Sequence, residues 1–351
     1  DPFCPFVLEI FYLGITTGTT ATTYSPAANV TRVQMAAFLS RSVDGVLRRG
    51  SARAILGQSW TTQSSGALGL TTLGAGGAQL PACDGTDVWA VRRSAASVAR
   101  VRASDGRLLE TWTGIPAATA AAVSPQGILV PGSTFPAKLF RIDPSLPPGG
   151  ATEVIGDLGM SFPGELAADG GRIWVIGDSG VAIVTPHAAL PWTVTTVTAG
   201  FSVLEGVLFD GANVWVTDNS PGTLLRLGSA GQVLQTVTVG LAPLLPVFDG
   251  TNLWVPSSGD STLSVVRAAT GAVLATLTGF GLASPVAAAF DGEKILVING
   301  SNQDSVSLWN AAGLSPLGSF STGANTQPSG ACSDGVNFWI TLFKTGQLAR
   351  F

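Results

Sequence analysis

The chain has 351 residues, of which 46% are apolar and only 11% are charged, and its formal net charge is −4. So long and apolar a chain can bury a large core, which excludes intrinsic disorder. The excess of acidic over basic residues, 22 against 18, excludes the basic surface that nucleic acid requires. The single histidine weighs against most histidine-dependent catalysts.

No run of about 20 apolar residues is present, so we expect no transmembrane segment. No basic stretch followed by an apolar core opens the chain, so no signal peptide is visible. The chain is therefore expected either to be cytosolic or to begin at a processed end.

Residues 1–45 predict a small helical unit. Residues 5–12 have an apolar helical pattern that a Gly- and Thr-rich stretch then breaks, and residues 29–39 predict a second helix. Thr31 is placed to cap this helix, and Gln34 completes a capping box three residues later.

These residues resemble one S-layer homology (SLH) repeat. The shared features are Gly14-Ile15-Thr16, an aromatic-x-Pro loop at residues 24–26, and the pair Thr31 and Arg32 at the helix start. The resemblance implies that Arg32 binds an acidic cell-wall polymer, assisted by Gly14, Ile15, Thr16 and Thr31. Two other arrangements stay open: the unit contacts copies from other subunits, or it packs on its own chain.

Residues 46–66 predict the end of a helix followed by a polar linker. Their Arg48, Arg49 and Arg53 are typical of a solvated face.

Residues 67–351 contain a repeat with a spacing of about 39 to 45 residues. Six copies have an Asp-Gly turn followed by a short apolar strand, usually with a central Trp, and a seventh has lost the Asp-Gly. Five copies keep both features, at Asp84–Trp89, Asp169–Trp174, Asp210–Trp215, Asp249–Trp254 and Asp334–Trp339. A sixth copy has Leu296 in the Trp place, and residues 124–130 form a degenerate seventh.

One full unit, residues 201–240, reads as four antiparallel strands with turn residues between them, which is typical of a β-propeller blade. The last unit ends after three strands. We expect residues 67–73, which are similar to the fourth strand at residues 272–278, to complete it. The predicted fold is an all-β, seven-bladed propeller that is closed in this way and so has no exposed sheet edge.

The repeats resemble the YVTN-type seven-bladed propellers, near the NHL-like and streptogramin-lyase-like groups. The resemblance covers residues 67–351 and implies the fold. It implies little about function, because this scaffold carries many activities.

Polar residues gather in two sets of loops: those joining the second and third strands, and those leading into each blade. The candidate binding residues at this propeller mouth are Arg92, Arg93, Glu165, Asp178, Glu205, Asp218, Asn219, Asp260 and Asp304. They suit a small molecule, a glycan or Ca²⁺, for which the four aspartates offer oxygen ligands. The alternative is that they are ordinary loop residues. No other cofactor is expected.

His187 falls on an outer turn of the third blade, where we expect a surface histidine. The repeated Trp residues are expected to fill the space between blades rather than to stack on sugars.

Cys83 and Cys332 lie on the first strands of the first and last blades, which become neighbours when the ring closes. Two states fit this placement: a disulfide, consistent with an oxidising exterior, or two free buried thiols.

The sequence therefore predicts a non-enzymatic extracellular or cell-surface protein, a structural or assembly component with an SLH-like interaction unit. Self-association, other envelope proteins and cell-wall polysaccharide are the expected partners. One alternative is a surface-anchored propeller that binds a glycan or small ligand. Another is a lactonase- or lyase-type enzyme, against which the single histidine argues.

Overall fold

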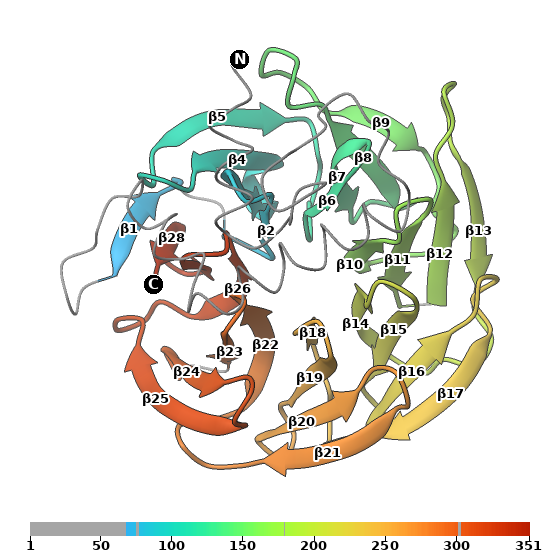
Figure 1. The fold of residues 1–351 in the computed structure, drawn as a ribbon. Coiled ribbons are helices and arrows are strands. Elements are labelled where there is room, and N and C mark those ends of the chain that lie inside the picture. Colours follow the sequence, from blue (N-terminus) through green and yellow to red (C-terminus); the bar gives the residue numbers. More distant parts are fainter. Residues whose placement is uncertain (1–67, 75–76, 179, 301–302) are drawn as a thin grey trace, which may run out of the picture. The chain divides into compact units, whose positions relative to one another are not determined.

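Seven four-stranded antiparallel sheets are arranged around a central axis (Figure 1). The computed structural model describes residues 68–74, 77–178, 180–300 and 303–351. The predicted all-β, seven-bladed propeller is confirmed. Residues 1–45, with Arg32 and the other SLH-like positions, and the predicted linker lie outside the described residues. Within the described part, no helix is long and apolar enough to cross a membrane.

Each blade is built from consecutive strands, except that the last blade takes its outer strand from the start of the described region. Blades 1 and 2 contain β2 (Ala82–Cys83), β3 (Asp87–Arg92), β4 (Ser97–Arg102), β5 (Leu108–Thr113), and β6 (Ala122–Ser124), β7 (Gly127–Gly132), β8 (Lys138–Ile142), β9 (Thr152–Ile155). Blades 3 and 4 contain β10 (Pro163–Ala168), β11 (Ile173–Gly177), β12 (Gly180–Thr185), β13 (Thr193–Val197), and β14 (Leu204–Phe209), β15 (Val214–Asp218), β16 (Thr223–Leu227), β17 (Val233–Thr238). Blades 5 and 6 contain β18 (Val247–Phe248), β19 (Asn252–Ser257), β20 (Thr262–Arg267), β21 (Ala272–Leu277), and β22 (Pro285–Phe290), β23 (Lys294–Asn299), β24 (Ser305–Asn310), β25 (Ser315–Ser321). Blade 7 contains β26 (Pro328–Ser333), β27 (Phe338–Leu342), β28 (Gln347–Arg350) and β1 (Gly69–Thr72), and one short 3₁₀ helix, η1 (Arg93–Ala95), follows β3.

Ring closure occurs where the sequence predicts it. β1 pairs antiparallel with β28, from Gly69 opposite Arg350 to Thr72 opposite Gln347 (Figure 1). The observed strand is shorter than the predicted one. It gives the last blade its fourth strand, so no three-stranded blade is left with an open edge.

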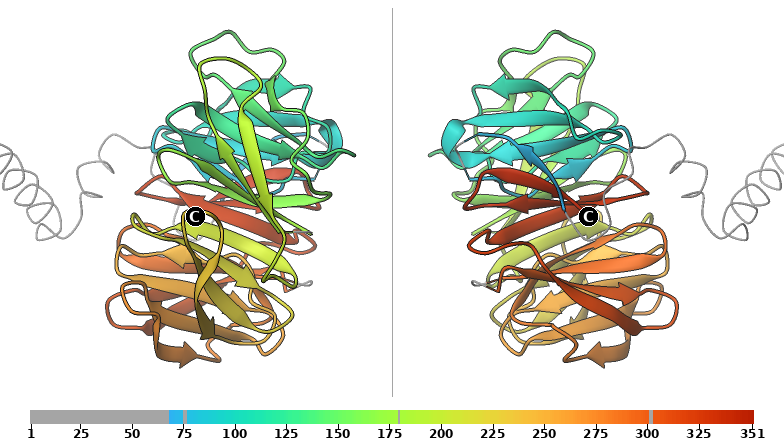
Figure 2. Two further views of the ribbon diagram at one scale, coloured as in Figure 1. Left: turned by 90° about the vertical axis from the view of Figure 1, so that its right-hand side faces the viewer. Right: turned by 90° about the vertical axis from the view of Figure 1, so that its left-hand side faces the viewer.

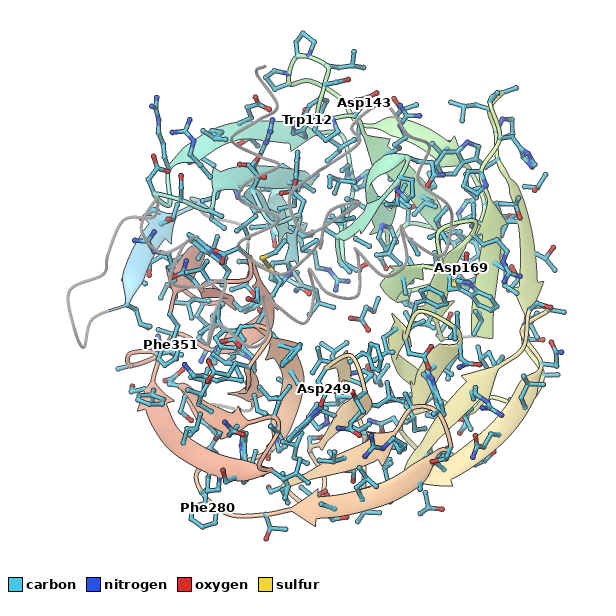
Figure 3. All side chains as sticks on the ribbon, viewed as in Figure 1. Trp112, Asp143, Asp169, Asp249, Phe280 and Phe351 are labelled. Atoms are coloured by element: carbon cyan, nitrogen blue, oxygen red, sulfur yellow. A yellow bond between two sulfur atoms is a disulfide. The ribbon has the colours of Figure 1, made fainter. Side chains whose placement is uncertain are left out.

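A disulfide also joins the first and last blades. Cys83 on β2 and Cys332 on β26 are bonded, with their Cα atoms 5.7 Å apart (Figure 3). It crosslinks positions separated by 249 residues, so the ring is closed both by strand pairing and by a covalent bond.

The repeated Asp holds the turn between the first two strands of a blade. In blade 4, Asp210 Oδ1 accepts hydrogen bonds from the amides of Ala212 and Asn213, and Oδ2 accepts one from Trp215 Nε1 at 2.7 Å. The carboxylate–Trp bond recurs in all five blades that keep both residues. The glycine after each Asp has φ between 89° and 99°, a region that residues with a Cβ rarely adopt.

The core lies between the blades, and the repeated Trp side chains fill it. All five are at most 1% exposed. Trp174 of blade 3 packs with Val207 and Val216 of blade 4, and Trp215 of blade 4 packs with Leu253 of blade 5. This agrees with the expectation that the Trp residues have a structural role. Figure 2 shows the stacked blades from the side.

Candidate functional site

The first strand of each blade lies next to the central axis (Figure 1). Strand registers define one equivalent position in all seven blades, two residues before the partner of the repeat Trp or of the Leu that replaces it in blades 2 and 6. In blades 3, 4, 6 and 7 this position is on the first strand, and in blades 1, 2 and 5 it lies two residues before that strand. In the sequence this position falls four residues before the repeat Asp or its Ser124 substitute. We call this set the channel ring: Leu80, Ala120, Glu165, Gly206, Leu245, Ala287 and Gly330. Glu165 is its one ionisable member.

The residues one position earlier form a second set, the mouth ring. Its members are Gln79, Thr119, Gly164, Glu205, Leu244, Val286 and Ser329. In blades 3, 4, 6 and 7 the strand register shifts here by a β-bulge. A bulge bends the strand and re-aims its side chains, which lets neighbouring residues face the same space.

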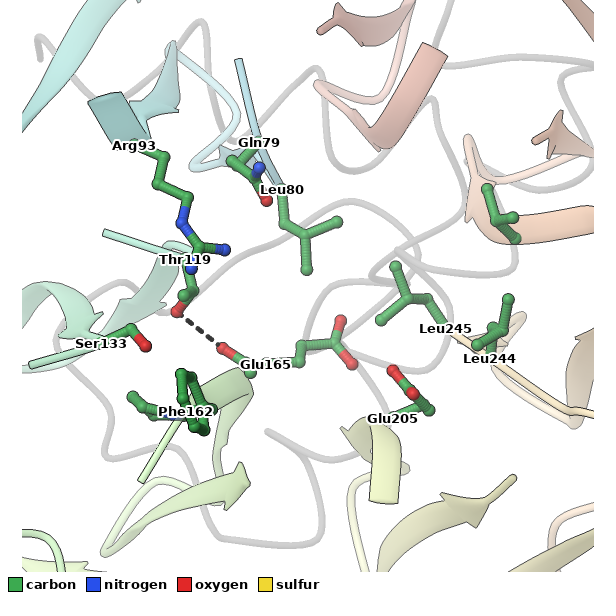
Figure 4. A pocket seen from close by; sticks show the side chains of 13 residues that line it. Gln79, Leu80, Arg93, Thr119, Ser133, Phe162, Glu165, Glu205, Leu244 and Leu245 are labelled. Atoms are coloured by element: carbon green, nitrogen blue, oxygen red, sulfur yellow. Dashed lines mark hydrogen bonds between the residues drawn. The ribbon is translucent and has the colours of Figure 1, made fainter. Parts of the chain in front are cut away.

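A pocket of about 340 Å³ lies where the two rings meet the loops (Figure 4). Most of its lining comes from members of the two rings. Arg93, from the segment between the second and third strands of blade 1, and Ser133, from the matching loop of blade 2, complete its polar side. Phe162, at the start of blade 3, adds an aromatic ring that is 69% exposed. Ligand pockets typically enclose about 300 to 1,000 Å³, so this one suits a small molecule.

Glu165 makes a contact that the other channel-ring residues cannot make. At two blade interfaces the backbone amide of the next blade donates to a channel-ring carbonyl: Ala121 to Leu80 at 3.3 Å, and Ala288 to Leu245 at 3.2 Å. The equivalent amide at the blade 3–4 interface, that of Val207, donates to the Glu165 carboxylate at 2.7 Å. A side-chain carboxylate therefore takes the place of a backbone carbonyl.

Desolvation dominates the electrostatics of Glu165. Protein surrounds the side chain except where it faces the pocket, and this burial raises the pKa of Glu165 to about 8, although the Val207 amide acts in the opposite direction. Glu165 is consequently mainly protonated at neutral pH. It accepts the Val207 amide through Oε2. Figure 4 shows its carboxyl group among the residues that line the pocket.

Glu205 of the mouth ring also lines the pocket. Partial desolvation raises the pKa of Glu205 above its ordinary value, and this side chain is more exposed than that of Glu165. Among the ion pairs found in the described residues, none joins Arg93 to either carboxylate. The pocket thus brings together two carboxyl groups in different environments and a separate cation.

Of the nine predicted mouth residues, Arg93, Glu165 and Glu205 line this pocket and the other six do not. The four aspartates instead accept backbone amides of the segments that lead into the first strand of the same blade or, for Asp304, of the next blade. Asp218 accepts the amides of Ser202 and Val203, and Asp178 and Asp260 each accept one loop amide. Asp304 accepts three successive amides, which lower its pKa, that of Gln327 acting most strongly.

These aspartates do not converge on a cation. No group of three or more His, Cys, Asp and Glu residues that could hold a metal occurs within the described ranges. Asn219 donates to the Pro243 carbonyl at 3.4 Å, and Arg92 ends β3 away from the pocket lining. Arg92 and Asp218 are the last residues of β3 and β15, and the other four lie in loops.

His187 lies between β12 and β13, on the outer side of blade 3. It bonds Thr193 Oγ1 at 2.9 Å and does not line the pocket, in agreement with the expected surface position.

Sequence reasoning missed the uncharged residues of the pocket. They are Gln79, Leu80, Thr119, Ser133, Phe162, Pro163, Gly164, Leu244, Leu245 and Val286. A signal for most of them is present in the sequence, because counting four and five residues back from each repeat Asp finds both rings. That count would also have separated Glu165 and Glu205 from the loop aspartates.

No protein-family profile and no curated protein matches the chain. Among solved structures it is similar to selenomethionine-substituted virginiamycin B lyase from Staphylococcus aureus, with a TM-score of 0.67 and 14% identity over 81% of this chain and 98% of that one. A streptogramin B lyase matches with a TM-score of 0.65 and 18% identity over 81% and 96% of the two chains. The WD40 β-propeller domain of Doa1 matches with a TM-score of 0.63 and 13% identity over 81% and 97%.

These likenesses correct the expectation of a non-enzymatic structural or assembly protein. The expectation rested on the SLH resemblance, with the single histidine held against an enzyme, yet two of these structurally similar propellers are enzymes. Identities of 13 to 18% establish the fold alone, so the activity of this chain is a matter for proposal.

Proposed function

We propose that this propeller is an acid–base enzyme of the lyase type that cleaves a carbon–oxygen bond of a small molecule in the pocket. The observation that carries the proposal is Glu165, a carboxyl group in an otherwise apolar or glycine ring, whose burial raises its pKa to about 8. A group that titrates near the working pH is suited to general acid–base catalysis.

The two carboxyl groups take different roles because their environments differ. Glu165, protonated at neutral pH, is the general acid, and the more exposed Glu205 is the general base. Glu205 removes a proton from carbon, the electron pair of that bond forms a carbon–carbon double bond, and the carbon–oxygen bond breaks. The leaving oxygen takes the proton of Glu165.

This assignment uses no histidine. A virginiamycin B lyase variant with a histidine replaced by alanine is described as catalytically inactive. The one histidine of the present chain, His187, lies outside the pocket lining. We therefore propose that the machinery of this chain differs from that of the lyases it resembles in fold.

The test is turnover of quinupristin and of a panel of small lactones and esters, followed by mass spectrometry. Elimination opens a lactone without changing its mass, whereas hydrolysis adds one water. Glu165→Gln and Glu205→Gln should each lower kcat by about 100-fold or more. Glu153→Gln, a change on the exposed outer strand of blade 2, is the matched control and should keep full turnover.

The pH profile gives a second readout. The acid must be protonated and the base ionised, so kcat should rise as Glu205 loses its proton and fall as pH passes about 8. Full activity of Glu165→Gln, addition of water to the product, or no turnover of any panel member would each contradict the proposal.

We also propose a setting for the chain outside the propeller. The SLH-like unit, residues 1–45, would bind an anionic cell-wall polymer through Arg32 and keep the propeller at the cell surface, with envelope proteins as further partners. The repeats would belong near the YVTN and NHL-like propellers. The disulfide between Cys83 and Cys332 supports an oxidising location. Arg32→Gln should abolish co-sedimentation of the full chain with purified wall material.

A further inference from the structure

The side chains that line the pocket are mainly polar on one side and aliphatic on the other. Blades 1 and 2 contribute four hydrogen-bonding side chains, Gln79, Arg93, Thr119 and Ser133, and one aliphatic side chain, Leu80. The opposite side, from blades 5 and 6, is purely aliphatic and consists of Leu244, Leu245 and Val286. Figure 4 shows Arg93 on one side of the pocket, Leu244 and Leu245 on the other, and the carboxyl of Glu165 extending between them.

Arg93 gives the polar side its charge. It is the one cation among the described residues that line the pocket, and among the ion pairs found in the described residues it takes part in none. Thr119 Oγ1 donates to the Gly164 carbonyl at 3.0 Å, so that hydroxyl is already occupied (Figure 4). A guanidinium presents several donors in a planar fork, which matches the two oxygens of a carboxylate.

The aliphatic side favours a different part of the ligand. Apolar groups gain free energy when Leu244, Leu245 and Val286 exclude water from them, whereas a polar group there would lose its hydrogen bonds to water. A ligand that uses both sides must therefore be charged at one end and apolar at the other.

We infer that the pocket binds a small amphiphilic carboxylate, with the carboxylate on Arg93 and the alkyl or aromatic part against Leu244, Leu245 and Val286. The inference rests on the proposed function, because it names the substrate class of the same site. The middle of such a ligand lies beside Glu165 and Glu205, so the bond to be cleaved is expected between the charged and the apolar ends. The exposed ring of Phe162 provides one further flat contact at the lip.

Binding to the full chain tests the inference without any turnover. The ligands are butanoate, hexanoate and hexanamide, measured by calorimetry at pH 7. Two added methylene groups should make hexanoate bind about 15-fold more tightly than butanoate. Hexanamide has nearly the same shape without the charge, and it should bind at least about 10-fold more weakly than hexanoate.

Variants assign the two ends of the ligand. Arg93→Gln should weaken hexanoate about 10-fold or more and leave hexanamide unchanged, whereas Leu244→Asn should reduce the preference for hexanoate over butanoate. Arg107→Gln, at an exposed arginine in the turn between β4 and β5, is the matched control. Equal binding of hexanoate and hexanamide, or unchanged hexanoate binding in Arg93→Gln, would overturn the inference.

The two proposals fail separately. If hexanoate binds as expected but Glu165→Gln keeps full turnover, the catalytic assignment fails and the ligand class stands. If turnover depends on Glu165 while charge and chain length do not affect binding, the ligand class alone fails.

Discussion

The repeated turn and the channel-ring position lie four residues apart in every blade, and they differ in how strictly their residues repeat. The turn is nearly uniform: in five blades the same Asp holds two backbone amides and a buried Trp. The channel ring has small or aliphatic residues in six blades and Glu165 in one. A residue that repeats in nearly every blade serves the folding of each blade. A residue that occurs in one blade only, such as Glu165, serves a purpose other than folding.

The physical cost of Glu165 supports this distinction. Backbone amides bond backbone carbonyls at the blade 1–2 and blade 5–6 interfaces, so that contact needs no carboxylate. A desolvated carboxyl group is unfavourable when ionised, as its raised pKa reflects. Pairing of the blades therefore does not account for Glu165, which agrees with the role proposed for it in the pocket.

Removing a Trp from the uniform region should have the largest effect. Trp215 is fully buried between blades 4 and 5, so Trp215→Ala should lower the free energy of unfolding by about 3 to 5 kcal/mol. Chemical denaturation gives the value. Leu274→Ala, at an exposed position on β21, is the control and should change stability by less than about 0.5 kcal/mol. Similar losses in both variants would show that the repeat does not mark the core.

Removing the disulfide between Cys83 and Cys332 should have the next largest effect on the free energy of unfolding. The double change Cys83→Ser and Cys332→Ser should lower the free energy of unfolding by about 2 to 4 kcal/mol, because the unfolded chain is no longer crosslinked across 249 residues. Reduced wild type should unfold at the same denaturant concentration as the double variant. An unchanged midpoint on reduction would mean that the pairing of β1 with β28 carries the closure alone.

The carboxylate of the repeated turn should contribute less than its Trp. Asp210→Ala removes the acceptor for two amides and for Trp215 Nε1, and it should cost about 1 to 3 kcal/mol by chemical denaturation. Asp260→Ala removes an acceptor in an exposed loop and should cost less. A larger loss of stability in Asp260→Ala than in Asp210→Ala would contradict the distinction between the repeated turns and the loops that join the second and third strands.

Replacing Glu165 should change the free energy of unfolding least at acidic pH, and the change should grow as pH rises. Its pKa is about 8 in the folded protein and near 4.5 when the chain is unfolded, so the folded state binds more protons between these values. The free energy of unfolding of wild type should therefore fall as pH rises from about 4.5 to 8. Glu165→Gln, which keeps an acceptor for the Val207 amide, should show a smaller fall. If the free energies of unfolding of wild type and Glu165→Gln change in parallel with pH, a group other than Glu165 titrates in this range.

The sequence predicts the propeller well because its signals are local and repeated. The spacing of Asp84, Asp169 and their equivalents predicts the blades, and the similarity of residues 67–73 to the fourth strand at residues 272–278 predicts how the last blade is completed. The mouth is harder, because a polar residue in a loop looks the same whether it faces a ligand or its own backbone. Asp218 and Glu165 both accept backbone amides, but Asp218 ends the second strand of blade 4, whereas Glu165 is on the first strand of blade 3, next to the channel.

The central claim is that Glu165 is a protonated carboxyl group at neutral pH. The most direct test is infrared difference spectroscopy of wild type against Glu165→Gln across pH 4 to 10, which isolates the carboxyl band of this one side chain. We expect that band to give way to the carboxylate band near pH 8. A transition near pH 4.5, the ordinary value for a glutamate, would contradict the account.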